Sequence, residues 1–160
     1  MVFFNCQDMQ LNNQSERAYL ILGTNMGDRE RNIRVAKSLL VTELSSTLAS
    51  QIFESSIIES EPWGFEADQK FLNQGIAFDT TCPPELLLEV CKYVEKKMGR
   101  DIDDVEYDEN GKRIYKSRII DIDIALYGDR IIDTPKLKIP HLQVEERDYA
   151  KKIICELKNL

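Results

Sequence analysis

The stretch Arg118-Ile119-Ile120-Asp121-Ile122-Asp123-Ile124-Ala125-Leu126-Tyr127 decides how this sequence of 160 residues is interpreted. Its period-two alternation predicts a β-strand with one apolar face and one acidic face. The residues expected to face the core are Ile120, Ile122, Ile124 and Leu126. Asp121 and Asp123 then share the other face, where two carboxylates can hold two cations roughly 3.5 to 4 Å apart.

Two interpretations of the carboxylate pair compete. Outward-facing acids also protect an edge strand against edge-to-edge pairing, and the strand alone slightly favours this structural role. Basic residues just ahead of the strand shift the balance, because cations that flank a carboxylate pair in an acidic protein indicate a site for charged ligands. These residues are Lys112, Arg113, Lys116 and Arg118.

Length and composition limit the classes of protein to consider. We expect a polar N-terminal extension over residues 1–17 and a single domain over 18–160. A net charge of −7 argues against general binding of nucleic acid or anionic membranes. No segment resembles a signal peptide or a membrane span, and scattered cysteines suit a reducing compartment. We therefore expect a cytoplasmic protein without nucleic-acid or membrane partners. We also expect it to work as a monomer.

The first part of the domain reads as a strand, a turn and a helix. Residues 18–22 form a short apolar run that ends in Gly23-Thr24-Asn25-Met26-Gly27-Asp28. Asp28 is the expected N-cap of a helix over residues 29–45. The core face of this helix is predicted to hold Ile33, Ala36, Leu40 and Leu44. The turn lacks the P-loop ending, so its glycines are interpreted as residues that supply positive φ.

The middle of the chain predicts two strands, over residues 51–58 and 71–80, and then a helix. Between the strands, residues 60–69 form a long connection with Trp63 and Phe65. These aromatic side chains either tuck under the sheet or belong to a functional loop, and the sequence favours neither. The helix begins at Pro83-Pro84 and ends at Gly99, with Glu95 largely off its apolar stripe. That stripe is Leu87, Val90 or Cys91, Val94 and Met98.

Residues 101–117 read as a long charged loop, acidic in its first half and basic in its second. The two halves pair with each other, or the basic half closes over an anionic substrate. Asn110-Gly111 suggests a hairpin turn. After the acidic strand, short strands are expected near residues 130–133 and 136–139, and a helix over 145–160.

The order strand, helix, strand, strand, helix, strand matches an α+β fold of the ferredoxin-like βαββαβ plan, in which an antiparallel sheet is covered by helices. Short motifs occur in a fixed order from about residue 18 to 150, and this ordered set resembles the 6-hydroxymethyl-7,8-dihydropterin pyrophosphokinase family. The motifs are Gly23-Thr24-Asn25 with Gly27-Asp28, Ser60-Glu61-Pro62-Trp63-Gly64, Phe71-Leu72-Asn73-Gln74, Glu95 with Gly99-Arg100, Arg118 to Ile124, and Pro140-His141 with Arg147 and Tyr149.

The resemblance implies transfer of the β,γ-pyrophosphoryl group of ATP to the hydroxymethyl group of the pterin, which releases AMP, in folate biosynthesis. It implies that Asp121 and Asp123 hold two Mg²⁺ ions that bridge ATP phosphates. Arg100 and Arg118 would be catalytic, by neutralising charge on the transferred group.

The resemblance also implies two sets of binding residues. Those expected to bind the pterin are Ser60, Trp63, Phe71, Asn73 and Tyr149. Those expected to bind ATP are Lys92, Glu95, Tyr115, Lys136, Lys138, His141 and Arg147. In this assignment two aromatic faces sandwich the flat heterocycle and an amide bonds its edge.

The sequence departs from the family pattern in the charged loop. Ile102 stands where a second basic residue is common, and Lys112 or Arg113 is the candidate substitute. Tyr115 replaces a common tryptophan, and no general base is evident. Two other classes compete: a non-catalytic ferredoxin-like module that binds a small ligand, and another two-metal nucleotidyl or phosphoryl transferase. The set of Phe71, Asn73 and Tyr149 argues for a planar heterocyclic acceptor.

Overall fold

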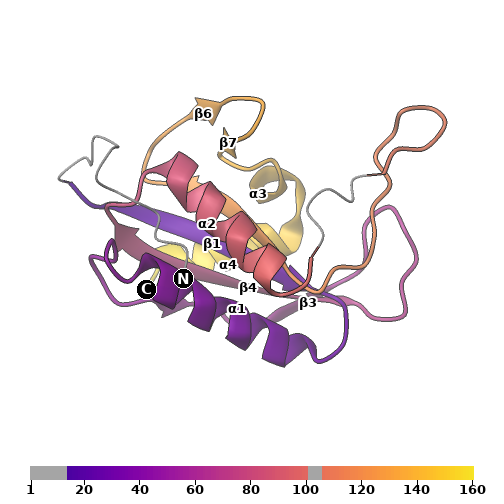
Figure 1. The fold of residues 1–160 in the computed structure, drawn as a ribbon, viewed down its shortest axis with the longest axis horizontal. Coiled ribbons are helices and arrows are strands. Elements are labelled where there is room, and N and C mark those ends of the chain that lie inside the picture. Colours follow the sequence, from indigo (N-terminus) through magenta and orange to yellow (C-terminus); the bar gives the residue numbers. More distant parts are fainter. Residues whose placement is uncertain (1–13, 101–105) are drawn as a thin grey trace.

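The computed structural model describes residues 14–100 and 106–160 and contains an antiparallel sheet with helices on both faces (Figure 1). Residues 1–13 of the predicted extension and 101–105 of the predicted loop lie outside the described residues. The elements are β1 (Glu16–Thr24), α1 (Arg29–Leu44), β2 (Phe53–Glu54), β3 (Ile58–Ser60), β4 (Phe71–Thr80), α2 (Pro84–Lys97), β5 (Asp121–Tyr127), β6 (Ile132–Asp133), β7 (Lys138–Ile139), α3 (Gln143–Glu146) and α4 (Asp148–Lys158). The α+β class expected from the sequence is confirmed.

The main sheet has the strand order β2-β4-β1-β5, and β3 also pairs with β4. The register of the central strand β1 places Gly23 opposite Asn73 on β4 and opposite Asp121 on β5. Two residues earlier on β1, Ile21 lies opposite Gly75 on β4 and opposite Asp123 on β5. Three distant motifs of the sequence are therefore brought side by side by backbone pairing alone.

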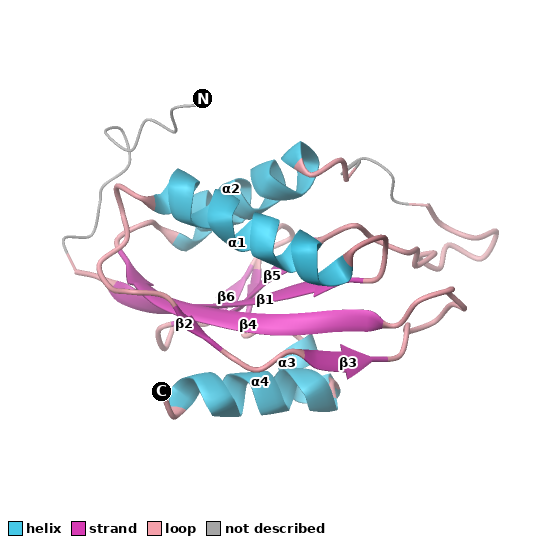
Figure 2. Ribbon diagram, turned by 90° about the horizontal axis from the view of Figure 1, so that it is seen from below, coloured by secondary structure: helices cyan, strands magenta, loops and turns pink. Residues whose placement is uncertain are grey.

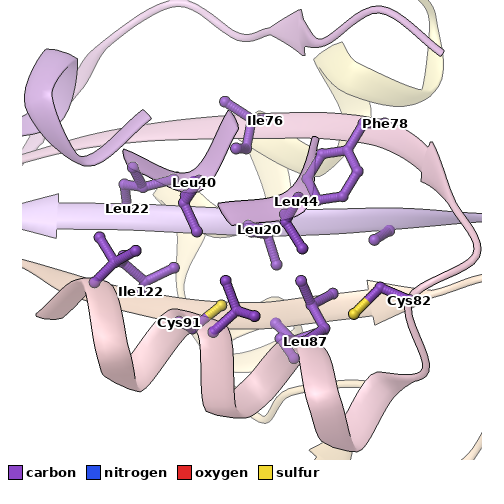
Figure 3. Packing of buried hydrophobic residues seen from close by; sticks show 14 of the residues in the cluster. Leu20, Leu22, Leu40, Leu44, Ile76, Phe78, Cys82, Leu87, Cys91 and Ile122 are labelled. Carbon is purple, nitrogen blue, oxygen red and sulfur yellow. The ribbon is translucent and has the colours of Figure 1, made fainter. Parts of the chain in front are cut away.

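One face of the sheet is covered by α1 and α2, which lie on the same side of it (Figure 2). The predicted core face of α1 is confirmed, and the Asp28 carboxylate caps that helix by accepting from the Arg31 amide at 3.0 Å. Between helices and sheet lies the larger apolar cluster, shown in Figure 3, in which Phe78 is fully buried. Its labelled members are Leu20, Leu22, Leu40, Leu44, Ile76, Phe78, Cys82, Leu87, Cys91 and Ile122.

The opposite face is covered by α4 over only part of its length (Figure 2). Gly75 lets this helix approach, because a Cβ there would lie 2.2 Å from Ile153 and 2.8 Å from Leu157. The contact builds a second, smaller apolar cluster that includes Ile21 and Ala77. α4 does not pack against the remaining part of this face, which forms the floor of a cavity.

The prediction that Leu126 faces the same side as Ile122 and Ile124 is wrong. The pairing of β1 with β5 shifts register between Tyr19 and Leu20, so β5 holds an extra residue at this point. Such a bulge reverses the alternation beyond it. Leu126 accordingly packs with the smaller cluster, and Tyr127 is buried in the larger one.

Two predicted elements are divided in the structure. In place of the strand predicted over residues 51–58, the structure has two short strands, β2 and β3, of which β3 extends to Ser60, and both pair with β4. The C-terminal helix is broken at Arg147, whose extended backbone separates α3 from α4. No helix within the described ranges is long and apolar enough to cross a membrane.

Candidate active site

A cavity of about 600 Å³ lies at the end of the sheet that α4 leaves uncovered. It is lined by every predicted site residue except Lys138. Those residues are Ser60, Trp63, Phe71, Asn73, Lys92, Glu95, Arg100, Tyr115, Arg118, Asp121, Asp123, Lys136, His141, Arg147 and Tyr149. Lys138, on the small β6-β7 ribbon, is largely exposed, and its ammonium lies 3.6 Å from an Asp133 carboxylate oxygen.

The floor of the cavity is the row formed by Asn73, Gly23 and Asp121 on three neighbouring strands. Neighbouring strands lie about 4.8 Å apart, so the outer two positions are separated by roughly 9.6 Å across the sheet. Gly23 is not a positive-φ residue, which corrects the expectation for this glycine, whereas Gly27 has φ of 61° as expected. A Cβ at Gly23 would lie 3.1 Å from Asn73 Oδ1, so glycine keeps the middle of the floor low.

The Asn73 amide is held in one orientation. Its side chain is almost fully buried, and Nδ2 donates to the Ile58 carbonyl at 3.1 Å and to Ser60 Oγ at 2.8 Å. Because both bonds occupy the amide nitrogen, Oδ1 is directed to the floor above Gly23. The site residue Ser60 thus also positions its neighbour.

Aromatic rings form the walls around this floor. Phe65 packs edge-on against Phe71, with ring centres 6.4 Å apart. Trp63 is 53% exposed, lies 5.8 Å from the Tyr115 ring, and has the Arg147 guanidinium 3.8 Å above its ring centre. Trp63 and Phe65 therefore line the cavity, and the alternative that they tuck under the sheet as core is wrong.

The two aspartates have different electrostatic environments. Asp121 accepts from Arg100 at 2.7 Å and faces Arg118 at 3.1 Å. Burial alone would raise the pKa of Asp121, but Arg118 and Arg100 outweigh it and the pKa falls below its ordinary value. Asp121 is thus an ionised carboxylate clasped by two guanidinium groups.

Burial and the nearby Asp121 charge raise the pKa of Asp123 to about 6. Gln143 Nε2 donates to Asp123 Oδ2 at 2.9 Å, and His141 Nε2 lies 3.7 Å from Oδ1. Both neighbours stabilise the charged form and limit the increase. The only histidine in the sequence therefore lies beside the carboxylate pair.

Glu95 is buried at this end of α2, contrary to the prediction that it lies off the apolar stripe. Its Oε1 accepts from the Ile122 amide at 2.7 Å, on the outer edge of β5, and from Arg100 at 2.5 Å. Burial, reinforced by the charge of Asp121, raises the pKa of Glu95 to about 8. Glu95 and Asp121 together hold the Arg100 guanidinium between them.

Asn25 positions Arg118 and was not assigned a role from the sequence. It is 3% exposed, its backbone amide donates to the Arg118 carbonyl at 3.1 Å, and its Oδ1 accepts from the Arg118 amide at 2.7 Å. Its Nδ2 donates to Ser117 Oγ at 3.0 Å and to the Gln69 carbonyl at 3.4 Å. The ends of both loops that border the cavity are thereby tied to β1.

The charged loop confirms one of the two expectations left open, and its closure over an anionic substrate stays a prediction. Glu106 and Lys116 pair at 2.5 Å, so acidic and basic residues of the loop do contact each other. Tyr107 and Arg113 form a bridge around the Asn110-Gly111 turn, which confirms the hairpin. Arg113 also lines the cavity and stacks over Tyr115 at 5.5 Å, whereas Lys112 is not among the lining residues. Figures 1 and 2 show residues 106–117 of this loop and residues 60–70 projecting from one end of the molecule.

Gln143 is the second residue that sequence reasoning missed. Besides its bond to Asp123, its Oε1 accepts from the Tyr149 hydroxyl at 3.0 Å. Its only sequence signal is a polar side chain two positions after His141. That signal is too weak to identify a site residue without the fold.

The donor set suits a hard cation that is shared with phosphate. Asp121 and Asp123 point from one strand face into the cavity, and seven lysine and arginine side chains and one histidine also line it. Among the described residues, no three His, Cys, Asp or Glu side chains are arranged to hold a metal by themselves. Mg²⁺ matches this arrangement, because it commonly takes one or two carboxylates and completes its shell with water and substrate phosphates.

Comparison with known proteins agrees with the geometry. Residues 19–159 match the family model described as 7,8-dihydro-6-hydroxymethylpterin-pyrophosphokinase (HPPK). The chain is 33% identical to 2-amino-4-hydroxy-6-hydroxymethyldihydropteridine pyrophosphokinase of Porphyromonas gingivalis, over 83% of this chain and 84% of the relative. It is 39% identical to the protein of that name in Aquifex aeolicus, over 82% and 73% of the two chains. A folic acid synthesis protein, fol1 of Schizosaccharomyces pombe, is 33% identical over 88% of this chain and 18% of its own length.

Proposed function

The chain belongs to the 7,8-dihydro-6-hydroxymethylpterin-pyrophosphokinase family, and we infer that it transfers pyrophosphate from ATP to 6-hydroxymethyl-7,8-dihydropterin in folate biosynthesis. The products are AMP and the pterin pyrophosphate. The competing ideas, a non-catalytic binding module and a transferase with another acceptor, are not favoured by these relatives. The observation that carries the proposal is the row Asn73, Gly23 and Asp121, which aligns an amide and a carboxylate on one floor.

In the reaction, the hydroxymethyl oxygen forms a bond to the β-phosphorus. The bond between that phosphorus and the oxygen bridging to the α-phosphate breaks, so AMP leaves and the hydroxyl proton passes to solvent. Arg100 and Arg118 lie beside the carboxylate pair. Their positive charges would also stabilise the negative charge on the transferred group. Positioning and electrostatic stabilisation supply most of the catalysis in such transfers.

The acceptor side is assigned to the aromatic walls and the amide. Phe71 and Tyr149 would stack on the two faces of the pterin, and the oriented Asn73 Oδ1 would accept from its edge. Trp63 would close the mouth, supported by its contacts with Arg147 and Tyr115. Ser60 contributes by orienting Asn73.

The nucleotide side is assigned to the basic rim. Lys92, Lys136, His141 and Arg147 line the cavity and would contact phosphates and nucleotide, as would Glu95 and Tyr115 on that side. Lys138 does not line the cavity in this structure, so its predicted contact requires the β6-β7 ribbon to approach. Arg113 is the better candidate than Lys112 for the second loop arginine.

Asp121 and Asp123 would hold Mg²⁺, which bound to ATP neutralises phosphate charge and fixes the phosphate geometry. Two ions are proposed because two carboxylates share one strand face. The ionised state of Asp121 at neutral pH supports this role, since a hard cation needs a deprotonated ligand.

Two features support finer aspects of the proposal. The strand order β2-β4-β1-β5, with helices after β1 and β4, supports assignment to the ferredoxin-like plan. The described cysteines Cys91 and Cys155 are free thiols, which supports a reducing, cytoplasmic location.

The test is incubation with ATP, Mg²⁺ and the pterin, with nucleotide products separated by chromatography. We expect AMP and pterin pyrophosphate, and no product once EDTA has removed the metal. Asp121→Asn and Asp123→Asn should each lower kcat on the order of 10²–10³-fold, by the loss of one charged group at the reacting phosphates. Asp79→Asn, on the same sheet face but beside Arg17, is the matched control. Release of ADP instead of AMP would contradict the proposal.

A further inference from the structure

One amide connects the two halves of the cavity. Gln143, the first residue of α3, donates from Nε2 to Asp123 Oδ2 at 2.9 Å and accepts at Oε1 from the Tyr149 hydroxyl at 3.0 Å. Asp123 belongs to the carboxylate pair and Tyr149 to the aromatic wall. A single side chain therefore contacts both the proposed metal side and the proposed pterin side.

The chemistry of the partners determines which way this amide points. A carboxylate oxygen accepts hydrogen bonds, whereas a neutral phenol can donate one. Burial raises the pKa of Tyr149 to about 12, so its hydroxyl keeps its proton and donates to Gln143. The reversed amide would set its oxygen against the carboxylate oxygen. The chain of bonds thus runs in one direction, from the Tyr149 hydroxyl through the amide to Asp123.

The backbone of Gln143 is also held in place by a hydrogen bond. Its backbone amide donates to His141 Nδ1 at 3.3 Å, and His141 Nε2 faces the other oxygen of Asp123 at 3.7 Å. The segment 141–143 therefore contacts both carboxylate oxygens of Asp123. Tyr149 is fixed independently, because α4 packs on Gly75 of the sheet through Ile153 and Leu157.

We propose that Gln143 is a positioning residue that orients Asp123 and Tyr149 together, and so couples the seating of the pterin to the binding of metal-bound phosphate. This inference rests on the proposed function. Groups that bond to metal-ligating carboxylates from outside commonly change metal affinity or activity by 10- to 100-fold when they are removed. In this chain such a group also contacts the acceptor pocket.

The test uses Gln143→Met, Tyr149→Phe and the double variant. Methionine keeps the length of glutamine without its amide, and phenylalanine keeps the stacking ring without its hydroxyl. Titration calorimetry measures Mg²⁺-dependent binding of α,β-methylene ATP, in which the bond broken by the reaction is replaced, and pterin binding to that complex. These readouts need no turnover. Gln51→Met, an exposed glutamine outside the cavity lining, is the matched control.

We expect Gln143→Met to raise the Mg²⁺ concentration for half-saturation by about 10-fold or more. Tyr149→Phe should weaken pterin binding and also raise the Mg²⁺ requirement, because the loss reaches Asp123 through Gln143. In the Gln143→Met background, Tyr149→Phe should add little to either change. Such non-additivity is the signature of a shared contact.

The inference is overturned if Tyr149→Phe leaves the Mg²⁺ requirement within about two-fold of the unchanged protein, the range expected for independent sites. If Gln143→Met does not fold, Tyr149→Phe alone still decides, since it removes one oxygen atom and keeps the ring. An unchanged protein that forms no AMP would reject the proposed function. An active protein whose single effects multiply fully in the double variant would reject only the coupling.

Discussion

Phe71 and Phe78 lie on the same strand, β4, and point to opposite faces of the sheet. Phe78 is fully buried in the apolar cluster under α1 and α2, whereas Phe71 is partly exposed and lines the cavity. Along β4 the first face contributes Ile76 and Phe78 to that cluster. The second face changes use along its length, from cavity floor at Asn73 to helix contact at Gly75 and Ala77.

The comparison shows how one strand divides stability from chemistry. Side chains on the α1/α2 face must fit the space between the sheet and these two helices, because α1 and α2 cover that face. On the α4 face, a short helix stabilises one part and leaves the other for polar groups oriented by neighbours such as Ser60. A substitution on the α1/α2 face of β4 should therefore affect folding, whereas one at Phe71 or Asn73 on the other face should affect ligand binding.

The largest effect should come from breaking the core face. Phe78→Ala should lower the free energy of unfolding by about 3–5 kcal/mol, since a fully buried aromatic ring is lost and a cavity is left. Denaturant unfolding measures this, and the fraction that stays folded should keep its affinity for the pterin.

Phe71→Ala is the partner experiment on the opposite face. It should weaken pterin binding by about 1–3 kcal/mol, the scale of stacking between a flat heterocycle and an aromatic ring. Its effect on unfolding should be smaller than that of Phe78→Ala, because its ring is partly exposed. Equal losses of stability for the two variants, with unchanged pterin binding, would contradict the division between the faces.

A smaller effect should follow from releasing the loop ends at the cavity. Asn25→Ala leaves the Arg118 amide without its side-chain acceptor, which costs about 1–3 kcal/mol for a buried group. The only tryptophan in the sequence, Trp63, lies six residues before Gln69, another partner of Asn25. Acrylamide quenching of its fluorescence should therefore increase in the variant.

Asn25→Asp separates the two roles of this side chain. It keeps an acceptor for the Arg118 amide but loses the donor to Ser117 and Gln69. Trp63 quenching should increase here too, with less loss of stability than in Asn25→Ala. Quenching that matches the unchanged protein in both variants would show that Asn25 does not restrain the Trp63 loop.

The smallest effect concerns a carboxylate on the same face as Asn73 but at the far end of β4. Asp79 pairs with Arg17 at 2.8 Å, and this hydrogen bond holds the pKa of Asp79 below its ordinary value. A lowered carboxyl pKa in the folded state stabilises the protein above the unfolded pKa, near 3.9, and this contribution is lost as pH falls through the folded value.

Asp79→Asn should accordingly lower the free energy of unfolding at pH 7 by only about 0.2–1 kcal/mol, because the pair is partly exposed to solvent. The difference from the unchanged protein should shrink below about pH 4. Urea unfolding at a series of pH values measures it, with the exposed Asp129→Asn as control. A difference that grows towards acid pH would contradict the assignment.

The sequence predicted the apolar core more accurately than the polar contacts of the cavity. The α1 core stripe and strand β4 were read correctly, since apolar periodicity reports burial directly. Leu126 was misplaced because a bulge depends on pairing with β1, which periodicity does not contain. Glu95 was misplaced because its burial is compensated by Arg100 and by the Ile122 amide, and the second of these partners is distant in sequence.

The candidate site residues were predicted from the ordered resemblance of their motifs to a family, not from spacing. The resemblance predicted most of the residues that line the cavity. It assigned no role to Asn25 and did not identify Gln143. Both act through hydrogen bonds to other site residues, and such bonds leave no periodic trace in a sequence. Their geometry could be read only once the strands and loops were placed together.

The row of Asn73, Gly23 and Asp121 has a consequence for which acceptors the cavity can serve. The spacing of hydrogen-bonded strands sets the backbone distance between Asn73 and Asp121, so a rotamer change cannot alter that distance. A one-residue slip of β4 or of β5 would send Asn73 or Asp121, respectively, to the opposite face. The proposed roles of these residues therefore predict that altered acceptor size is accommodated by the loops at the mouth, where Trp63 and Tyr115 lie.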